Sequence, residues 1–464
     1  MDTTPADTSA SGPRDDTSIE DDWRNWRWEY GDQPGHSPRY AVVNVGDSAS
    51  GYDENIFDAN FEEDIGTQTI TLGWFHRYPA RFAADVLSVV IAEALRKSKR
   101  PVRTILDPFC GTGAVLAASR QIMRDAVGIE LTTLGQMISS VRLDPPDSIS
   151  DALRTTLALA DLTPTPSGVI NSDLEAWIGT PNAHRLFAWL DCVSAIADAR
   201  TRRFMQLAIS QSLRPSSRWL AGSIKVTADP NRTPSPIERV LPRFAKQLAR
   251  DCIAEYESAR SAAMVTGRRR SPRTTVIGGD GLRLPLGENS VDAIITSPPY
   301  FVTYDYFEVQ RLTYLAFGWK TSRHTQLGAK YGHAPNGVHC TSLVPSFAGW
   351  YEKFNRESSF LGRALRAYGE GFEQHAREAL RVVTPGGLVA YSVANSVRHG
   401  EIFDLVSAVK EMLIDVGFVS VEATPRPQAG RRILPAGRDT NTGRFAGNSA
   451  RAGVREYVVC GISP

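Results

Sequence analysis

The fold is decided by the stretch Ile294-Ile295-Thr296-Ser297-Pro298-Pro299-Tyr300. The residues from Val291 to Thr296 are mostly apolar or β-branched, which predicts a buried strand. Two prolines end that strand abruptly, because proline donates no ladder hydrogen bond and disfavours helix in the residue before it. Ser297 and Tyr300 are left at the carboxyl end of the strand, where open α/β sheets bind their ligands. The stretch therefore predicts a pocket for a flat polar group.

A second turn follows the strand expected at 102–106, in the sequence Asp107-Pro108-Phe109-Cys110-Gly111-Thr112-Gly113. A helix from Ala114 and a strand ending at Glu130 complete a strand–turn–helix–strand unit, which predicts a parallel sheet. The glycines let the backbone approach a ligand closely, and the helix N-terminus favours negative charge. Glu130 can accept hydrogen bonds from ribose hydroxyls. These features together predict a site for a nucleotide-like cofactor.

The cofactor is also expected to carry positive charge. Asp107 ends its strand and suits a cationic group of the ligand. The turn is not G-x-G-x-x-G and no lysine follows it, which disfavours a P-loop NTPase. A ligand with both a ribose and cationic groups is S-adenosylmethionine. Asp280 ends another expected strand, next to Gly281, and suits the adenine amino group of that ligand.

The alternation of strands and helices stops between residues 145 and 272, where the sequence reads as helical. Residues 201–275 contain 15 Arg/Lys and 5 Asp/Glu, a net charge of +10, whereas residues 1–64 contain 4 and 16, a net charge of −12. We expect an acidic, partly disordered N-terminal arm (1–64), an α/β domain (65–144 plus 273–464) and a basic helical insert (145–272). A basic segment is a candidate nucleic-acid footprint, although a solvated helical face explains it equally well.

The remaining pattern closes the sheet. We expect a helix at about 362–380, a tight turn at 382–387, a strand at 388–393, a helix at 403–416 and an antiparallel pair at 417–422 and 456–460. The stretch 301–358 is too long for an ordinary connection, so a functional role is expected for it.

Composition narrows the class of protein. No apolar run approaches the ~18 residues needed to cross a membrane, and the polar, acidic N-terminus does not predict a secretory signal. The 5 cysteines are scattered without a CxxC pair, which argues against a disulfide framework and against a metal site. We therefore expect a cytoplasmic protein with no membrane partner.

The two turns together carry a resemblance. The segments 107–113 and 297–300 resemble the paired motifs of the amino-methyltransferase family of DNA modification enzymes, which methylate N4 of cytosine or N6 of adenine. The resemblance covers most of residues 70–143 and 273–460. It implies an α/β fold with the Rossmann-like sheet of a methyltransferase dependent on S-adenosylmethionine, closed by an antiparallel pair. The residues it implies for cofactor binding are Phe75, His76, Pro79, Asp107, Phe109, Gly111, Gly113, Glu130, Leu131, Asp280 and Gly281.

The catalytic residues implied by the resemblance are Ser297, Pro298, Pro299 and Tyr300. An exocyclic amine is a poor nucleophile, and the Ser297 hydroxyl and the Pro298 carbonyl can accept hydrogen bonds from it. The prolines fix these acceptors, so little reorganisation is needed. The product nitrogen is cationic and acidic, so no strong base is required first. Tyr300 can stack on the base, which must be flipped out of duplex DNA.

Serine at position 297, in place of Asp or Asn, favours N4 of cytosine in this family, and N6 of adenine stays open. An RNA base-amine methyltransferase and a catalytically silent DNA-binding subunit are alternatives from other classes. The lack of an evident RNA-binding module disfavours the first, and the intact motifs disfavour the second. The expected partners are double-stranded DNA with a flipped target base and cognate restriction or defence-system proteins. DNA recognition is open among the insert, the connection after Tyr300 and the segment 426–455, which contains seven arginines.

Overall fold

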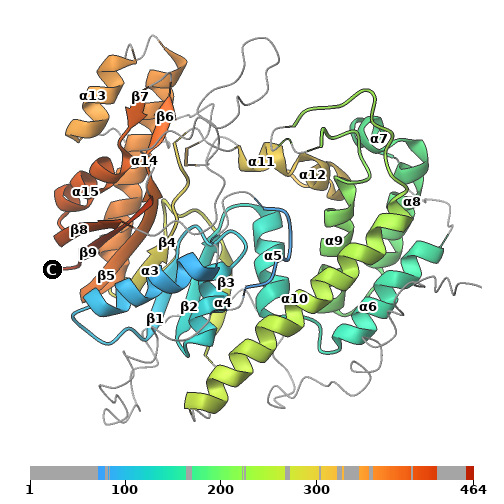
Figure 1. The fold of residues 1–464 in the computed structure, drawn as a ribbon, viewed down its shortest axis with the longest axis horizontal. Coiled ribbons are helices and arrows are strands. Elements are labelled where there is room, and N and C mark those ends of the chain that lie inside the picture. Colours follow the sequence, from blue (N-terminus) through green and yellow to red (C-terminus); the bar gives the residue numbers. More distant parts are fainter. Residues whose placement is uncertain are drawn as a thin grey trace, which may run out of the picture.

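The computed structural model describes residues 70, 72–78, 82, 84–162, 170–221, 223, 226–266, 272–301, 305–320, 327–328, 344–354, 359–398, 401–425 and 456–464. Its centre is a seven-stranded sheet in the order β3-β2-β1-β4-β5-β9-β8 (Figure 1). The strands are β1 (Thr104–Asp107), β2 (Asp125–Glu130), β3 (Thr274–Gly278), β4 (Val291–Thr296), β5 (Val383–Ala394), β8 (Val419–Pro425) and β9 (Glu456–Ile462). A separate two-stranded sheet joins β6 (Ser396–Arg398) to β7 (Glu401–Phe403).

The first five strands are parallel. β1 pairs with β2 on one side and with β4 on the other, and β3 and β5 extend the sheet in each direction. β9 then lies antiparallel between β5 and β8. This arrangement confirms the predicted α/β fold class with its closing antiparallel pair. The strand order reverses between β1 and β4, so the topological switch point lies at their carboxyl ends.

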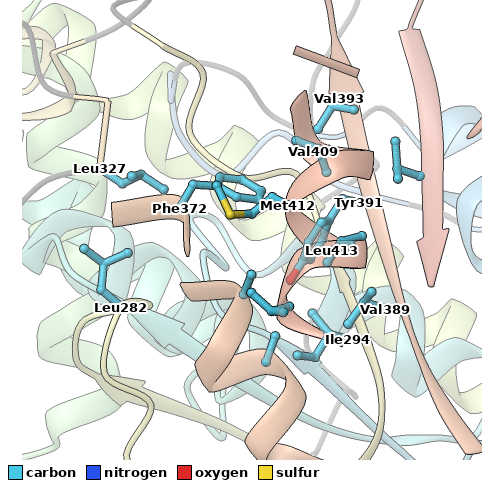
Figure 2. Packing of buried hydrophobic residues seen from close by; sticks show 14 of the residues in the cluster. Leu282, Ile294, Leu327, Phe372, Val389, Tyr391, Val393, Val409, Met412 and Leu413 are labelled. Atoms are coloured by element: carbon cyan, nitrogen blue, oxygen red, sulfur yellow. The ribbon is translucent and has the colours of Figure 1, made fainter. Parts of the chain in front are cut away.

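Helices cover both faces of the sheet, because the side chains of each central strand alternate between two apolar layers. On β4, Ile294 faces a cluster that includes residues of α14 and α15, such as Phe372 and Met412 (Figure 2). Ala293 and Ile295 face a second cluster, formed with α3 and α4. The helices of these layers are α3 (Ala84–Lys97), α4 (Ala114–Gln121), α14 (Phe360–Val382) and α15 (Leu405–Val416).

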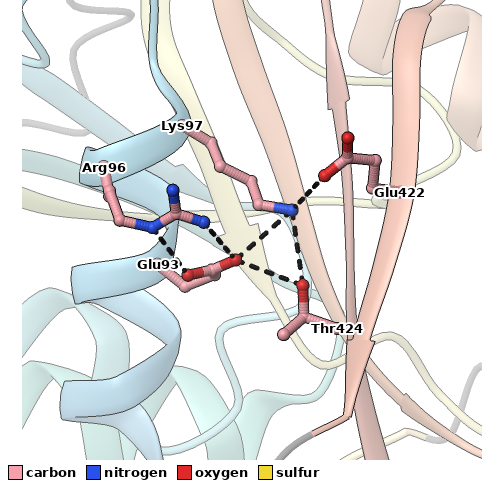
Figure 3. A network of polar contacts seen from close by, with 5 residues as sticks. All are labelled: Glu93, Arg96, Lys97, Glu422 and Thr424. Carbon is pink, nitrogen blue, oxygen red and sulfur yellow. Dashed lines mark hydrogen bonds and ion pairs between the residues drawn. The ribbon is translucent and has the colours of Figure 1, made fainter.

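A polar network joins the edge strand β8 to α3 (Figure 3). Lys97 Nζ lies 2.8 Å from Glu422 Oε2 and 3.3 Å from Glu93 Oε1. Thr424 donates to the same Glu93 oxygen at 3.2 Å, and Arg96 pairs with Glu93 at 3.0 Å. Ion pairs this close to the surface contribute at most about 1 kcal/mol each. Their shared carboxylate nevertheless fixes β8 against α3.

The predicted helical stretch contains α6 (Ile149–Ala158), the 3₁₀ turn η3 (Leu159–Asp161), α7 (Ser172–Ile178), α8 (Thr180–Ser194), α9 (Ala199–Leu213) and α10 (Ile237–Thr266). Ser148, Asn171 and Asp198 cap α6, α7 and α9, because each side chain accepts a backbone N–H of the first turn. Figure 1 shows these helices gathered beside the sheet, next to α5 (Thr133–Leu143). One apolar cluster runs through α5 and this group, so the two parts share a core. The division into domains stays a prediction.

The segment after β4 also contains helices, namely α11 (Tyr306–Val309), α12 (Arg311–Phe317) and α13 (Pro345–Lys353). One local prediction was wrong: the turn expected at 382–387 is a bulge within β5. Val291 of β4 pairs with Val383, but Ala293 already pairs with Leu388, and Gly386 takes the bend at a φ of +75°. Within the described part of the chain, no helix is long and apolar enough to cross a membrane.

Candidate active site

A cavity lies at the switch point, where β1 and β4 end. It contains about 810 Å³ of empty space, part of it open to solvent. The predicted site residues that line it are Asp107, Phe109, Gly111, Glu130, Leu131, Asp280, Gly281, Ser297 and Pro299. Both turns singled out in the sequence therefore reach one cavity.

A hydrogen bond joins the two strand ends from which these turns begin. The Thr296 hydroxyl, at the end of β4, donates to Asp107 Oδ1 at 2.6 Å, and the Phe109 amide donates to the same oxygen at 3.1 Å. The Asp107 side chain is buried, and burial raises its pKa to about 7 although both hydrogen bonds oppose the shift. Asp107 is therefore a carboxyl group that ionises near neutral pH, and no cationic side chain among the described residues pairs with it.

Glu130 fixes the glycine-rich turn from the neighbouring strand. Its Oε2 accepts the Gly111 amide at 2.8 Å, and its Oε1 accepts both the amide and the hydroxyl of Thr132, at 2.8 and 2.6 Å. Thr132 in turn caps α5. Burial raises the pKa of Glu130. A carboxylate has about four acceptor positions, so Oε2 keeps capacity for a hydroxyl of a ligand.

The wall near Asp280 is packed closely. A Cβ on Gly281 would lie 2.5 Å from a ring carbon of Phe109, so only glycine fits there. The Gly281 carbonyl lies 2.8 Å from His375 Nδ1, and His375 Nε2 lies 3.0 Å from the Tyr391 hydroxyl. Burial lowers the pKa of His375 to about 4, so the ring is neutral and its Nδ1 carries the proton that the carbonyl accepts. Burial raises the pKa of Asp280, whose carboxylate accepts an amide two residues on.

The proline turn is fixed from two sides. The Ser297 hydroxyl donates to the Ser392 carbonyl at 3.2 Å, which leaves the lone pairs of its oxygen as acceptors. The Tyr368 hydroxyl donates to the Pro299 carbonyl at 2.9 Å. Tyr300 packs against the apolar cluster of α14 and α15 instead of lining the cavity.

Several predicted residues lie elsewhere. Phe75 and His76 face the helical region: the Phe75 amide donates to Asp251 at 2.9 Å, and His76 Nε2 lies 2.9 Å from the Ser210 hydroxyl. Gly113 is the N-cap residue directly before α4, in the left-handed conformation and against Ser139. Pro298 is buried but does not line the cavity. Pro79 lies outside the described residues, as do the acidic arm and the segment 426–455.

Aromatic residues at the cavity were missed by the sequence reasoning. Tyr78, Phe82 and Tyr306 line it, and the Tyr78 and Tyr306 rings lie 6.0 Å apart with an interplanar angle of 32°. The Tyr78 hydroxyl lies 3.3 Å from the Thr132 hydroxyl, next to Glu130. Tyr78 directly precedes Pro79, which the resemblance implies for cofactor binding, and Phe82 follows Pro79 by three residues, whereas no periodicity marks Tyr306. Within the described ranges, no group of three or more His, Cys, Asp or Glu residues could hold a metal ion.

Comparison with known proteins gives one related sequence. No protein-family model matches the chain. A type II methyltransferase, M.MvaI of Kocuria varians, is 22% identical over 243 residues, which are 49% of this chain and 52% of that protein. The chain thus spans about half the length of this curated relative.

Two solved structures of the rRNA methyltransferase aviRa from Streptomyces viridochromogenes overlap with the fold. One covers 89% of this chain and 96% of its own at 11% identity, with a TM-score of 0.28. The other covers 74% of this chain and 85% of its own at 10% identity, with a TM-score of 0.23. An overlap this loose does not bear on function.

Proposed function

We propose that the protein is a DNA methyltransferase that moves a methyl group from S-adenosylmethionine to the exocyclic amine of a flipped base. The observation that carries the proposal is the hydrogen bond between Thr296 and Asp107. It joins the ends of β1 and β4, from which the turn expected to bind the cofactor and the turn expected to bind the base begin, at the edge of the sheet where α/β proteins bind ligands. The similarity to M.MvaI supports the same class of reaction. Serine at position 297 favours N4 of cytosine.

The residues of the cavity fit the cofactor. Asp107 and Glu130 are two buried carboxyl groups with raised pKa values, which a positively charged ligand would stabilise in the ionised form. Gly111, at a φ of +51°, and the close-packed Gly281 let the backbone approach a ligand. Bound S-adenosylmethionine supplies an electrophilic methyl group on a cationic sulfur.

The residues of the proline turn orient the amine. Because the Ser297 hydroxyl donates its proton to the Ser392 carbonyl, its oxygen is free to accept a hydrogen of the amine. Tyr368 holds the Pro299 carbonyl, so the turn is fixed before the base arrives. Tyr306 lines the cavity where Tyr300 does not, so we assign stacking on the base to Tyr306.

The proposal is tested by expressing the chain, digesting host DNA and total RNA to nucleosides, and measuring added methyl groups by mass spectrometry. We expect methylation at N4 of cytosine in DNA, and a loss of about 10²-fold in Ser297→Ala, because one acceptor for the amine is removed. The matched control is Ser261→Ala, at an exposed position on α10. Methylation of RNA alone would assign the protein to the RNA class, and full activity of Ser297→Ala would remove the role given to Ser297.

A further inference from the structure

A cluster of arginines lies where the segment before the cavity meets α9. His76 Nε2 is 2.9 Å from the Ser210 hydroxyl on α9, which fixes the backbone next to Arg77 against that helix. Arg214 follows Ser210 by four residues in helical conformation, so it lies on the same side of α9. Burial is the main cause that lowers the pKa of Arg214 to about 10, and the positive charges of Arg77 and Arg232 lower it further.

Arg214 and Arg232 are held by contacts with neutral groups. The Arg214 guanidinium lies 4.3 Å from the Trp219 ring centroid and donates to the Ser223 carbonyl. Arg232 donates to the Trp219 and Pro215 carbonyls. Within the described residues, no carboxylate pairs with Arg77, Arg214 or Arg232. Carbonyl acceptors occupy only part of the five N–H donors of each guanidinium and leave its charge uncompensated.

The cluster is next to the cavity. Arg77 is exposed, and the next residue, Tyr78, lines the cavity beside Tyr306. A base flipped into the cavity stays attached to its own strand, so the neighbouring phosphates must lie near the cavity entrance. Phosphate oxygens carry the negative charge that would compensate these arginines, and arginine binds them with paired hydrogen bonds.

We propose that Arg77, Arg214 and Arg232 form a phosphate-binding cluster that holds the backbone of double-stranded DNA beside the flipped base. The choice of DNA as the partner rests on the proposed function. Contacts to phosphate position the duplex without reading its sequence, so the cluster contributes to binding of any duplex. It also gives the helical region a role at the entrance to the cavity, because Arg214 and Arg232 belong to that region.

The test is binding of a fluorescent 25-base-pair duplex of arbitrary sequence, measured by anisotropy over a series of salt concentrations. Each phosphate contact contributes about 0.9 to the slope of log affinity against log salt. Arg77→Gln should therefore lower that slope by about 1 and weaken binding about tenfold at 0.1 M salt, while Arg77→Lys keeps the slope. The control is Arg377→Gln, which removes one charge from an arginine that is 60% exposed and paired with Glu373 at 2.7 Å.

A slope and an affinity in Arg77→Gln that equal those of Arg377→Gln would overturn the cluster. If Arg77→Gln loses binding to an RNA duplex while its binding to DNA is unchanged, the cluster does not bind DNA. The thermal midpoint of Arg77→Gln should match that of the wild type, since the residue is exposed. The binding assay requires no methyl transfer: a wild type that binds with the Arg77-dependent slope and methylates nothing refutes the proposed function alone.

Discussion

At the scale of single residues, the cavity is governed by charge. Asp107 and Glu130 are both buried, and the charge of Glu130 adds to the desolvation that raises the pKa of Asp107. The Thr296 hydroxyl and the Phe109 amide offset only part of this effect. A ligand cation near Asp107 would favour its ionised form, so protons and the ligand compete for this carboxylate.

This competition predicts a pH dependence. Below a pKa of about 7 Asp107 is mostly protonated, so affinity for S-adenosylmethionine should rise with pH by up to tenfold per unit between about pH 6 and pH 7, and then level off. Asp107→Asn should bind S-adenosylmethionine more weakly at pH 8, by about tenfold or more. Its affinity should also change less with pH, with Glu130 as the remaining buried acid. Calorimetric titration at several pH values measures both. A wild-type affinity that does not change with pH would contradict the assignment of Asp107.

At the scale of elements, α14 supports both halves of the cavity. Tyr368, His375 and Glu378 are spaced so that they lie on one side of this helix. The Tyr368 hydroxyl donates to the Pro299 carbonyl, and His375 Nδ1 donates to the Gly281 carbonyl. Glu378 accepts a hydrogen bond from the Leu284 amide at 2.8 Å. One helix therefore sets the distance between the proline turn and the loop that carries Asp280.

Tyr368→Phe tests that role with little change in packing. The Pro299 carbonyl loses its donor, and a lost hydrogen bond of this kind destabilises the arrangement by about 0.5–1.5 kcal/mol. We expect kcat for methylation to fall about tenfold while KM for S-adenosylmethionine stays within twofold, because Asp107 and Glu130, which are proposed to hold the cofactor, are untouched. Tyr457→Phe, on β9, is the matched control. An unchanged kcat, or a rise in KM alone, would refute a role for Tyr368 in positioning the turn.

The same helix shows what the sequence could and could not predict. The strands β1 and β4 follow from local patterns, since each is an apolar run that stops at proline, and α4 follows from the glycine-rich turn before it. The strand β2 is an apolar run that ends in an acidic residue. The bonds from Tyr368 and His375 do not follow from any pattern, because only the fold brings α14 against loops that precede it by some 70 to 95 residues.

The placement of Phe75 and His76 illustrates the same limit. Their sequence was assigned to the cofactor side, but the partners that hold them, Asp251 and Ser210, come from the helical region more than 130 residues further along. Phe75 adopts a φ of +47°, which is rare outside glycine and persists where surrounding contacts enforce it. Such contacts depend on how the helical region docks, which local sequence does not encode.

At the scale of the whole molecule, a buried polar joint connects the sheet to the helical region. Arg142 of α5 donates to the Gly73 carbonyl at 2.9 Å and lies 3.4 Å from Glu255 of α10. Glu255 accepts the Gly73 amide at 2.8 Å, and Arg142 also lies over the Phe75 ring, 4.5 Å from its centroid. The segment that leads to Tyr78 is thus held between α5 and α10.

We predict that breaking the buried ion pair of this joint destabilises the protein much more than breaking an exposed ion pair does. Arg142 and Glu255 have side chains that are 1% and 6% exposed, so Arg142→Ala would leave the buried Glu255 without the cation that is paired with it. Breaking such a pair destabilises a protein by about 3–5 kcal/mol.

The matched change is Arg154→Ala, which removes an arginine paired with Asp151 on the surface of α6, where the side chains are 76% and 61% exposed. It should change the free energy of unfolding by at most about 1 kcal/mol. Urea unfolding followed by tryptophan fluorescence measures both variants. Because the joint also holds the segment before Tyr78, Arg142→Ala should weaken binding of S-adenosylmethionine at temperatures where it remains folded. Equal stabilities of the two variants would show that the joint does not hold the sheet and the helical region together.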